Sequence, residues 1–157
     1  MNRRQFLQQA GGAVILGSCG LAGAATPTIE KLRLSDREWR ERLTPEQYEV
    51  LRFGKTEFAG SSPLDREYRT GTYACAGCGL HLFSSAWKYN SRTGWPSFWD
   101  AIPGHIITRR MNLAFRAPIE YHCARCEGHQ GHVFEDGPPP TGLRYCNNGV
   151  ALDFIPA

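Results

Sequence analysis

Two Cys-x-x-Cys pairs restrict the possible folds of this chain more than any other feature of its sequence. Cys75 and Cys78 form the first pair, and Cys123 and Cys126 form the second. Two thiolates three positions apart on a tight turn can bind one ion, and two such turns supply the four soft ligands that suit Zn²⁺. Because residues 79–122 separate the pairs, one structural zinc ion would join two distant parts of a single domain.

Other uses of the four cysteines stay open at this point. The pairs could form disulfides in an oxidising compartment, or they could bind iron as rubredoxin does. Thioredoxin-like redox pairs need a strand-to-helix junction, which the sequence does not predict. A zinc ribbon that only binds a partner would need nothing beyond these cysteines. The motif therefore predicts a metal and leaves the function open.

The first 25 residues have the pattern of an export signal. Residues 3–7 place two arginines before a Phe-Leu pair, and an uncharged stretch rich in glycine and alanine follows. This resembles a twin-arginine signal, so we expect export to the periplasm. Cleavage near residue 24 would release a soluble protein, whereas a lipobox ending at Cys19 would leave a lipid anchor as the only membrane contact. The remaining segments are then a tether, residues 26–34, and a folded domain, residues 35–157.

Short strands and turns dominate the predicted fold, because the 17 glycines and 10 prolines of the whole chain suit them better than long helices. Two capping boxes, Ser35 with Glu38 and Thr44 with Gln47, predict helices over residues 36–42 and to about Phe53. No helix separates the later strands, so we expect a mainly β fold with antiparallel sheets. The predicted strands are residues 72–74, 80–83, 106–108, 119–122, 131–134 and 144–146, with a stiff, extended surface segment at residues 137–142.

The charge balance gives no sign of a nucleic-acid partner. The formal net charge is +3, and 16 basic against 15 acidic residues remain once Arg3 and Arg4 are removed with the signal. A nearly neutral protein lacks the basic surface that binds polyanions.

One further cysteine, Cys146, lies outside both the paired motifs and the signal. Arg144 is two positions away, so on a strand both side chains share a face, and the cation would favour the thiolate. A free cysteine is also often a buried, inert residue. His129 and His132 follow directly after the second cysteine pair, and a cysteine with a histidine partner is a recurring catalytic arrangement.

An aromatic cluster occupies residues 93–99, which include Trp95, Phe98 and Trp99. These rings either pack in the core or form an apolar wall for a small substrate group. Trp95 suits the wall best, because Gly94 and Pro96 hold it on both sides.

Several segments of the domain occur together in one order. They are Cys75-x-x-Cys78, residues 94–98 (Gly-Trp-Pro-Ser-Phe), Cys123-x-x-Cys126, residues 131–134 (Gly-His-Val-Phe), and residues 136–146 (Asp-Gly-Pro-Pro-Pro-Thr-Gly-Leu-Arg-Tyr-Cys) with Asn148. Together they resemble the methionine sulfoxide reductase B family, which reduces the R epimer of methionine S-oxide. The resemblance extends from about Leu34 to Ile155. It implies that family's two antiparallel sheets, the β-tent, with short helices at the N-terminal side.

The resemblance also implies a role for each matching residue. The expected catalytic residues are Cys146 as the nucleophile, His132 and His129 as acid–base and orienting groups, and Asn148 as a supporting residue. The expected substrate contacts are Trp95, which would face the S-methyl group, with Phe98 and Arg144. The expected ligands of one structural Zn²⁺ are Cys75, Cys78, Cys123 and Cys126.

The chemistry of a sulfoxide calls for these residue types. Its sulfur is electrophilic when its oxygen is protonated or strongly hydrogen-bonded, so a thiolate must attack while a histidine donates a proton. Methionine then leaves, and Cys146 becomes a sulfenic acid. Many family members have a resolving cysteine where this chain has Thr93. We therefore expect oxidised proteins as substrates, no internal disulfide from Cys146, and direct reduction by an external, thioredoxin-like thiol.

Overall fold

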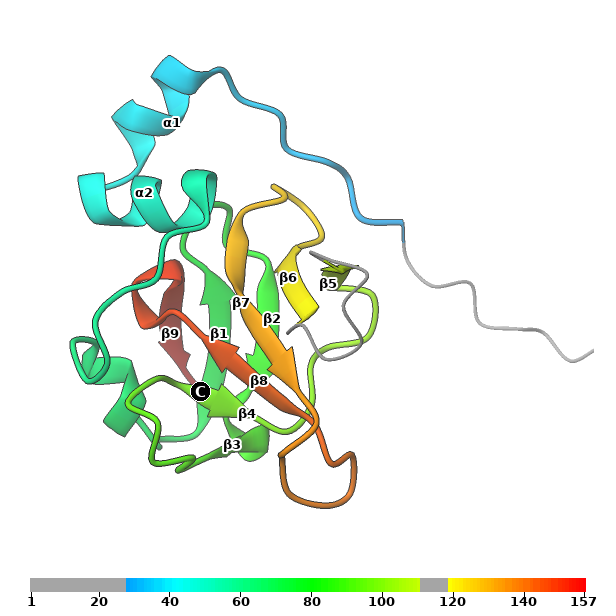
Figure 1. The fold of residues 1–157 in the computed structure, drawn as a ribbon. Coiled ribbons are helices and arrows are strands. Elements are labelled where there is room, and N and C mark those ends of the chain that lie inside the picture. Colours follow the sequence, from blue (N-terminus) through cyan, green and yellow to red (C-terminus); the bar gives the residue numbers. More distant parts are fainter. Residues whose placement is uncertain (1–27, 111–118) are drawn as a thin grey trace, which may run out of the picture.

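Two antiparallel sheets with two short helices at one end make up the fold (Figure 1). The computed structural model describes residues 28–110 and 119–157, so the predicted signal and Cys19 lie outside the described residues. Among the described helices, none has the length and apolar character needed to cross a bilayer. Part of the predicted tether contacts the domain, because the Leu32 amide donates to the Arg125 carbonyl at 2.9 Å.

The two predicted helices are confirmed, and their capping residues explain where they begin and end. Helix α1 covers Asp36–Arg42 and helix α2 covers Pro45–Phe53. The Ser35 side chain accepts from the third residue of α1, and Thr44 does the same for α2, which satisfies amides that the first turn leaves free. Gly54 ends α2 in the left-handed conformation, with φ of 68°.

The smaller sheet has three strands in the order β2-β1-β9, and the larger has six in the order β3-β4-β8-β7-β6-β5. Of three 3₁₀ helices, η1 lies between α2 and β1, η2 between β2 and β3, and η3 between β8 and β9. The bounds are β1 Gly71–Cys75, β2 His81–Ser84, β3 Lys88–Tyr89, β4 Ser97–Phe98, β5 Ile106–Arg110, β6 Ile119–Cys123, β7 His129–Phe134, β8 Arg144–Asn147, β9 Leu152–Pro156, η1 Pro63–Arg66, η2 Ser85–Trp87 and η3 Gly149–Ala151.

All six predicted strands are present, and three further strands were missed. Strands β3 and β4 have two residues each, too few to show alternation in the sequence. Strand β9 pairs along β1 at the edge of the smaller sheet, where its final proline is tolerated. The expected extended segment at residues 137–142 is wrong. Instead, the Gly137 amide donates to the Gly142 carbonyl at 2.9 Å and the Gly142 amide donates to the Pro138 carbonyl at 3.0 Å, so the chain reverses there.

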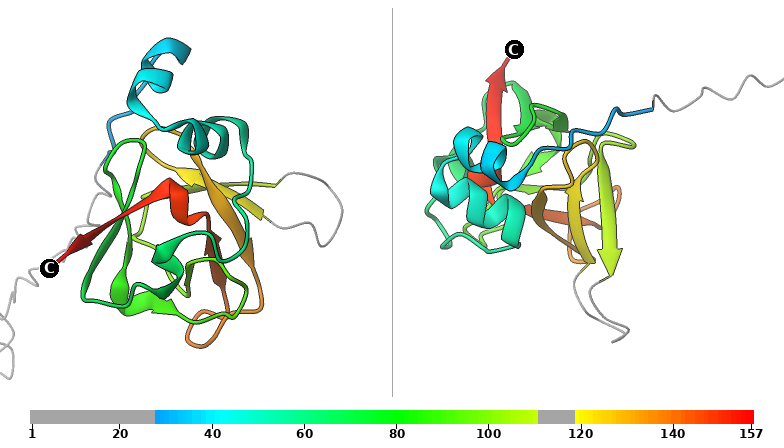
Figure 2. Two further views of the ribbon diagram at one scale, coloured as in Figure 1. Left: turned by 90° about the vertical axis from the view of Figure 1, so that its left-hand side faces the viewer. Right: turned by 90° about the horizontal axis from the view of Figure 1, so that it is seen from above.

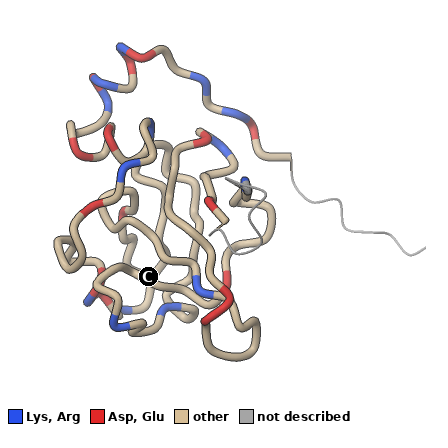
Figure 3. Tube along the Cα trace, in the orientation of Figure 1, with Lys and Arg blue, Asp and Glu red and all other residues tan. Residues whose placement is uncertain are grey.

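Aromatic rings fill the core. Tyr73 and Phe83 from the smaller sheet meet Phe98 and Tyr121 from the larger one, and all four are fully buried. Phe83 and Phe98 stack with ring centroids 4.2 Å apart. The two views in Figure 2 show α1 and α2 at one end of both sheets. Along the described trace, basic and acidic residues are interspersed (Figure 3).

Candidate functional site

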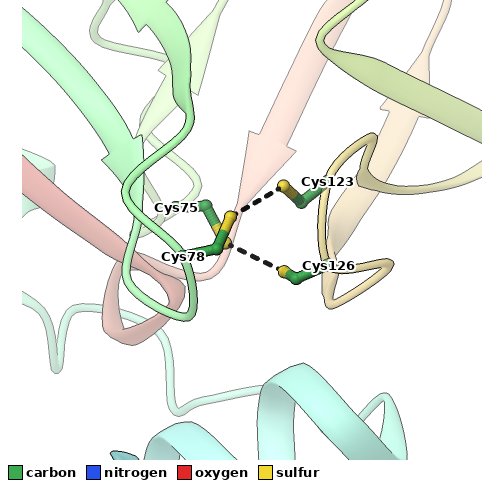
Figure 4. Close-up of side chains that lie close together, drawn as sticks. All are labelled: Cys75, Cys78, Cys123 and Cys126. Carbon is green, nitrogen blue, oxygen red and sulfur yellow. Dashed lines mark hydrogen bonds between the residues drawn. The ribbon is translucent and has the colours of Figure 1, made fainter. Parts of the chain in front are cut away.

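Four buried cysteines converge from the two sheets (Figure 4). Cys75 ends β1 of the smaller sheet and Cys123 ends β6 of the larger one, and each is followed by a tight turn that carries the second cysteine of its pair. The Sγ atoms of Cys75 and Cys126 are 3.6 Å apart, and those of Cys78 and Cys123 are 3.5 Å apart.

These distances fit a metal better than a disulfide. Four sulfurs about 2.3 Å from one tetrahedral ion are roughly 3.8 Å from each other, whereas a disulfide bond is about 2.05 Å long. All four residues are free thiols in the structure. Hydrogen bonds among the four thiols lower the pKa of Cys78 and of Cys126 and raise the pKa of Cys75 and of Cys123, so two of the thiols ionise readily while the other two keep their protons.

The surroundings of the cluster hold it in place. Gly128 approaches Leu51 of α2 so closely that a Cβ there would lie 2.9 Å from the leucine side chain. Gln130 is fully buried, and its Nε2 donates to the Cys75 sulfur at 3.3 Å. Such outer contacts fix the orientation of metal ligands. The four cysteines therefore can hold a metal ion.

A second constellation lies on one face of the larger sheet, where five residues stand directly opposite one another on neighbouring strands. In register order they are Ser97, Cys146, His132, Glu120 and Arg109. Residues directly opposite in an antiparallel pair share a face, with Cβ atoms about 4.5–5.5 Å apart. The structure thus brings Cys146 next to His132, although residues 133–145 separate them in sequence.

Opposing influences act on the Cys146 thiol. Burial raises its pKa, while the charge of Arg144 and hydrogen bonds from Thr93 and Arg144 act to lower it. Arg144 shares the face of Cys146, as alternation predicted, and binds both carboxylate oxygens of Asp136 at 2.8 Å. The thiol is therefore protonated until a base or a bound substrate shifts the balance, with a cation ready to stabilise the thiolate.

The two predicted histidines differ in exposure. His129 is 3% exposed, and its Nδ1 lies 2.6 Å from the Glu120 carboxylate, which orients the ring. His132 is half-buried, with its ring centroid 5.4 Å from that of His129. Burial lowers the pKa of both imidazoles, so both favour the neutral form. His132 is the histidine beside Cys146, and Glu120, which stands opposite His132 on the next strand, is also the carboxylate that orients His129.

Asn148 is buried and acts on the backbone around the site. Its Nδ2 donates to the Gln130 carbonyl at 3.0 Å, and its Oδ1 accepts from the Glu57 amide at 3.1 Å. The Glu57 carboxylate in turn accepts from the amides of Gly149 and Val150 at 2.7 and 2.8 Å. Burial raises the pKa of Glu57 in spite of these bonds. This network holds the end of β8 against β7.

Trp95 and Phe98 lie in different environments. The half-buried indole of Trp95 donates to the Glu57 carbonyl at 3.3 Å, and Gly94, with φ of 89°, lets the preceding turn approach the Gly60 backbone. Phe98 follows Ser97 on β4 and therefore points to the other face of the sheet, away from Cys146. It is 0% exposed, so the expectation that it contacts substrate is corrected: Phe98 packs the core.

Comparisons with known proteins agree with this geometry. The model of the SelR domain matches residues 43–156. The chain belongs to the SelR, or MsrB, family. A protein of Methanosarcina barkeri named peptide methionine sulfoxide reductase MsrB is 49% identical over 83% of this chain and 90% of its own length. A protein of the same name from Leptospira interrogans is 46% identical over 76% of this chain and 92% of its own length.

A solved structure is also similar, but only slightly. The Mis18 'Yippee-like' domain has a TM-score of 0.43 and 16% identity, and the match covers 57% of this chain and 98% of that domain.

Four polar residues of this SelR chain were not anticipated from its sequence. Glu57 and Gln130 gave no signal, because each acts through contacts distant in sequence. Glu120 and His122 are two positions apart on the strand that ends at Cys123, so alternation would have placed both on one face. Both lie beside His129, with Glu120 Oε1 3.1 Å from His122 Nε2.

Proposed function

We propose that this chain reduces methionine-R-sulfoxide in proteins to methionine, with Cys146 as the nucleophile. The observation that carries the proposal is the direct opposition of Cys146 and His132 on neighbouring strands of the larger sheet. Family membership supplies the reaction, because the relatives are named peptide methionine sulfoxide reductases. The geometry supplies a soft nucleophile and a proton donor side by side.

The reaction transfers one oxygen atom. Neutral His132 takes the proton of the Cys146 thiol. The thiolate then forms a bond to the sulfoxide sulfur while His132 passes that proton to the oxygen, which weakens the sulfur–oxygen bond. As the sulfur–oxygen bond breaks, the oxygen moves to Sγ of Cys146, and the new bond between Sγ and the methionine sulfur breaks and leaves its electron pair on that sulfur. Cys146 is then a sulfenic acid, and methionine leaves. Two electrons from an external dithiol then reduce the sulfenic acid to the thiol, with water and the dithiol's disulfide as products.

The neighbours of Cys146 support these steps. Arg144 and the Thr93 hydroxyl stabilise the thiolate, and the contact of Arg144 with substrate is proposed from the family resemblance. Trp95 is fixed by its bond to Glu57 and offers a half-exposed indole face for the S-methyl group. Asn148 and His129 position the backbone and His132 without themselves reacting.

The ion in the four-cysteine cluster is proposed to be a single structural Zn²⁺. Four thiolates in tetrahedral spacing suit zinc, and all four positions are taken, so no site is left for substrate. When bound, the ion supplies folding free energy and no reaction step.

The test is turnover of separated R and S epimers of a blocked methionine sulfoxide, with dithiothreitol as reductant. We expect the chain to consume the R epimer only, and Cys146→Ser to abolish turnover while the metal content stays unchanged. Loss of turnover together with the metal would mean that the variant is misfolded, and Cys146→Ala then repeats the comparison. A folded, metal-loaded chain that consumes neither epimer would overturn the proposal in favour of a zinc-ribbon binding module.

The fate of the sulfenic acid follows from Thr93. Thr93, which acts to lower the pKa of Cys146, stands at the position where many family members have a second cysteine. After one turnover without reductant, dimedone should therefore label Cys146. In Thr93→Cys the label should be lost and an internal disulfide should replace it. Mass spectrometry of the Cys146 peptide distinguishes the two products, and a disulfide within the unmodified chain would contradict the expectation.

We further propose that residues 1–25 direct export to the periplasm, as a signal before the tether (26–34) and the domain (35–157). The twin arginine and the uncharged stretch after it support this. Replacing Arg3 and Arg4 by lysine should retain the protein in the cytoplasm, as cell fractionation would show. Labelling with a palmitate analogue, compared with Cys19→Ser, decides whether Cys19 carries a lipid anchor.

A further inference from the structure

Three polar side chains gather beside the proposed catalytic His132, and among them only His129 has a part in the reductase mechanism, as a positioning residue. Glu120 and His122 come from β6, and His129 comes from β7 directly opposite His122. Each offers one ligand atom, and these atoms all lie within 4.8 Å of one another. We propose that Glu120, His122 and His129 form a second metal site, which binds a divalent transition-metal ion of the Zn²⁺ type.

The orientation of His122 supports this proposal. Its Nδ1 lies 3.1 Å from the Glu127 carbonyl, and because a carbonyl only accepts, Nδ1 carries the proton. In the neutral ring, Nε2 then presents a lone pair, and it lies 3.1 Å from a carboxylate oxygen of Glu120. Among the described residues, Nε2 of His122 has no hydrogen-bond partner with proper geometry. Two lone pairs that face each other at this distance are stabilised by a cation between them.

The hydrogen bond to Glu127 is itself a feature of metal-binding histidines. A ligating imidazole usually donates its second N–H to a carbonyl or carboxylate, which fixes the tautomer and the ring. His122 makes this bond already, so its Nε2 is aimed at Glu120 without rearrangement.

The distances are close to those of a metal site. Two ligands about 2.0–2.1 Å from a tetrahedral ion are roughly 3.3 Å apart. The His122–Glu120 distance is 3.1 Å and the His129–Glu120 distance is 2.6 Å, so these two pairs would have to separate by about 0.2 and about 0.7 Å to admit an ion. The ion would replace the proton that His129 shares with Glu120, and that proton would move to Nε2 of His129 or to water.

Burial and charge around the three residues favour a cation. The side chains of His122, His129 and Glu120 are 10%, 3% and 14% exposed, so the ligands are largely dehydrated but reachable from the sheet face. Arg109, which stands opposite Glu120, is paired with Glu127 at 3.2 Å. Two imidazoles and one carboxylate, with an open fourth position, suit Zn²⁺, Co²⁺ or Cu²⁺.

The effect of this second ion on catalysis depends on the proposed function, whereas the binding of the ion does not. Because His129 orients the catalytic face through Glu120, an ion bound here would hold both residues and inhibit methionine sulfoxide reduction. Excess zinc would then switch off repair reversibly, whereas the ion in the four-cysteine cluster would stay bound.

The experiment adds Co²⁺ to the full chain in which the cysteine cluster is loaded with Zn²⁺. We expect a second bound metal equivalent by elemental analysis, with weak visible d–d bands and no thiolate-to-cobalt charge-transfer band. His122→Gln should lose this equivalent and keep the zinc. His81→Gln, which removes an exposed histidine from β2, should bind both ions like the unmodified chain.

Three results would overturn the proposal: only one metal equivalent in the unmodified chain, a second equivalent that persists in His122→Gln, or a thiolate band that disappears in Cys146→Ser. The metal content of the unmodified chain is measured without any variant, so the proposal can be refuted even if His122→Gln misfolds. Turnover measured in the same samples is a separate readout. A chain that binds two ions but reduces no sulfoxide would refute the proposed function and leave the metal site standing.

Discussion

The reactivity of Cys146 depends on its burial and on two nearby charged side chains, Arg144 and Asp136. Burial raises the pKa of the thiol above its ordinary value of 9.0, and the nearby Arg144 opposes this. Asp136 weakens the effect of Arg144, because its carboxylate pairs with the guanidinium. The pKa of Cys146 is therefore adjustable in either direction by single substitutions on the same sheet face.

The first prediction concerns the rate at which iodoacetamide alkylates Cys146. Thiolate reacts and thiol does not, so the rate should still be rising with pH at pH 9. Arg144→Met should slow alkylation about three- to tenfold at neutral pH, because the cation is lost. Asp136→Asn should speed it, because the cation is no longer neutralised. Peptide mapping isolates the alkylation of Cys146 from that of the other cysteines. If both variants were alkylated at the rate of the unmodified chain, Arg144 would have no electrostatic role.

The second prediction concerns the closest approach of β7 and β8, at Gly131. A Cβ on Gly131 would lie 1.9 Å from the Cys146 carbonyl oxygen, so the strands that hold Cys146 and His132 would have to separate. Gly131→Ala should cost about 3 kcal/mol in the free energy of unfolding and most of the activity.

Gly60→Ala is the matched control for this substitution. Its φ is 76°, but nothing lies within 4 Å of the added Cβ, so only the left-handed backbone cost of about 1–2 kcal/mol applies. Urea denaturation of both variants checks the difference. An equal loss in the two would mean that strand spacing at Gly131 is not what matters.

At the scale of elements, β7 links the metal cluster to the catalytic face. His129 and His132 lie on the face of Cys146, while Gln130 points the other way and donates to the Cys75 sulfur. One strand thus holds a metal ligand in place through one side chain and positions the reactive groups through its others.

The third prediction removes that link. Gln130→Met keeps the volume but not the N–H···S bond, and loss of such an outer-shell bond typically weakens metal affinity 10- to 100-fold. Gln47→Met is the control, because Gln47 caps α2 and has no contact with the cluster. Competition with a chromophoric chelator measures both. Equal zinc affinity in Gln130→Met and the unmodified chain would show that the bond has no effect on the metal.

The elements also show which features a sequence reveals. The starts of α1 and α2 could be predicted because a capping box lies within four consecutive residues. The cysteine cluster could be predicted because metal ligands in a tight turn have a fixed spacing in sequence. Phe98 was misassigned because a two-residue strand gives no alternation to tell one sheet face from the other. Glu57 was missed because its partners, Gly149 and Val150, lie across the fold.

The roles of Cys146, Trp95 and the histidines were expected from resemblance, not from the physics of the chain. Alternation placed Arg144 beside Cys146, but no local pattern could place His132 opposite Cys146. That pairing depends on the register of β7 with β8, and the loop between those strands fixes the register. The geometry of the site is therefore a property of the sheet.

For the whole molecule, the cysteine cluster joins the two sheets at the end where α2 packs. Cys75 belongs to the three-stranded sheet and Cys123 to the six-stranded one, and Leu51 of α2 covers both turns. A chain of this size has a free energy of unfolding of about 5–15 kcal/mol, and a structural zinc ion in a small domain supplies an amount of the same order. The proposed zinc ion would therefore decide whether the two sheets stay together.

The last prediction follows from this comparison. Cys78→Ser, or removal of the ion by a strong chelator, should lower the melting temperature by more than about 15 °C or unfold the chain at 25 °C. Cys146→Ser removes a thiol that is not part of the cluster, so it should keep both the metal and the melting temperature. Calorimetry with parallel zinc analysis measures these changes. If the metal-free chain melted within a few degrees of the loaded one, the aromatic core alone would hold the sheets together, and the ion would only stiffen the turns that carry it.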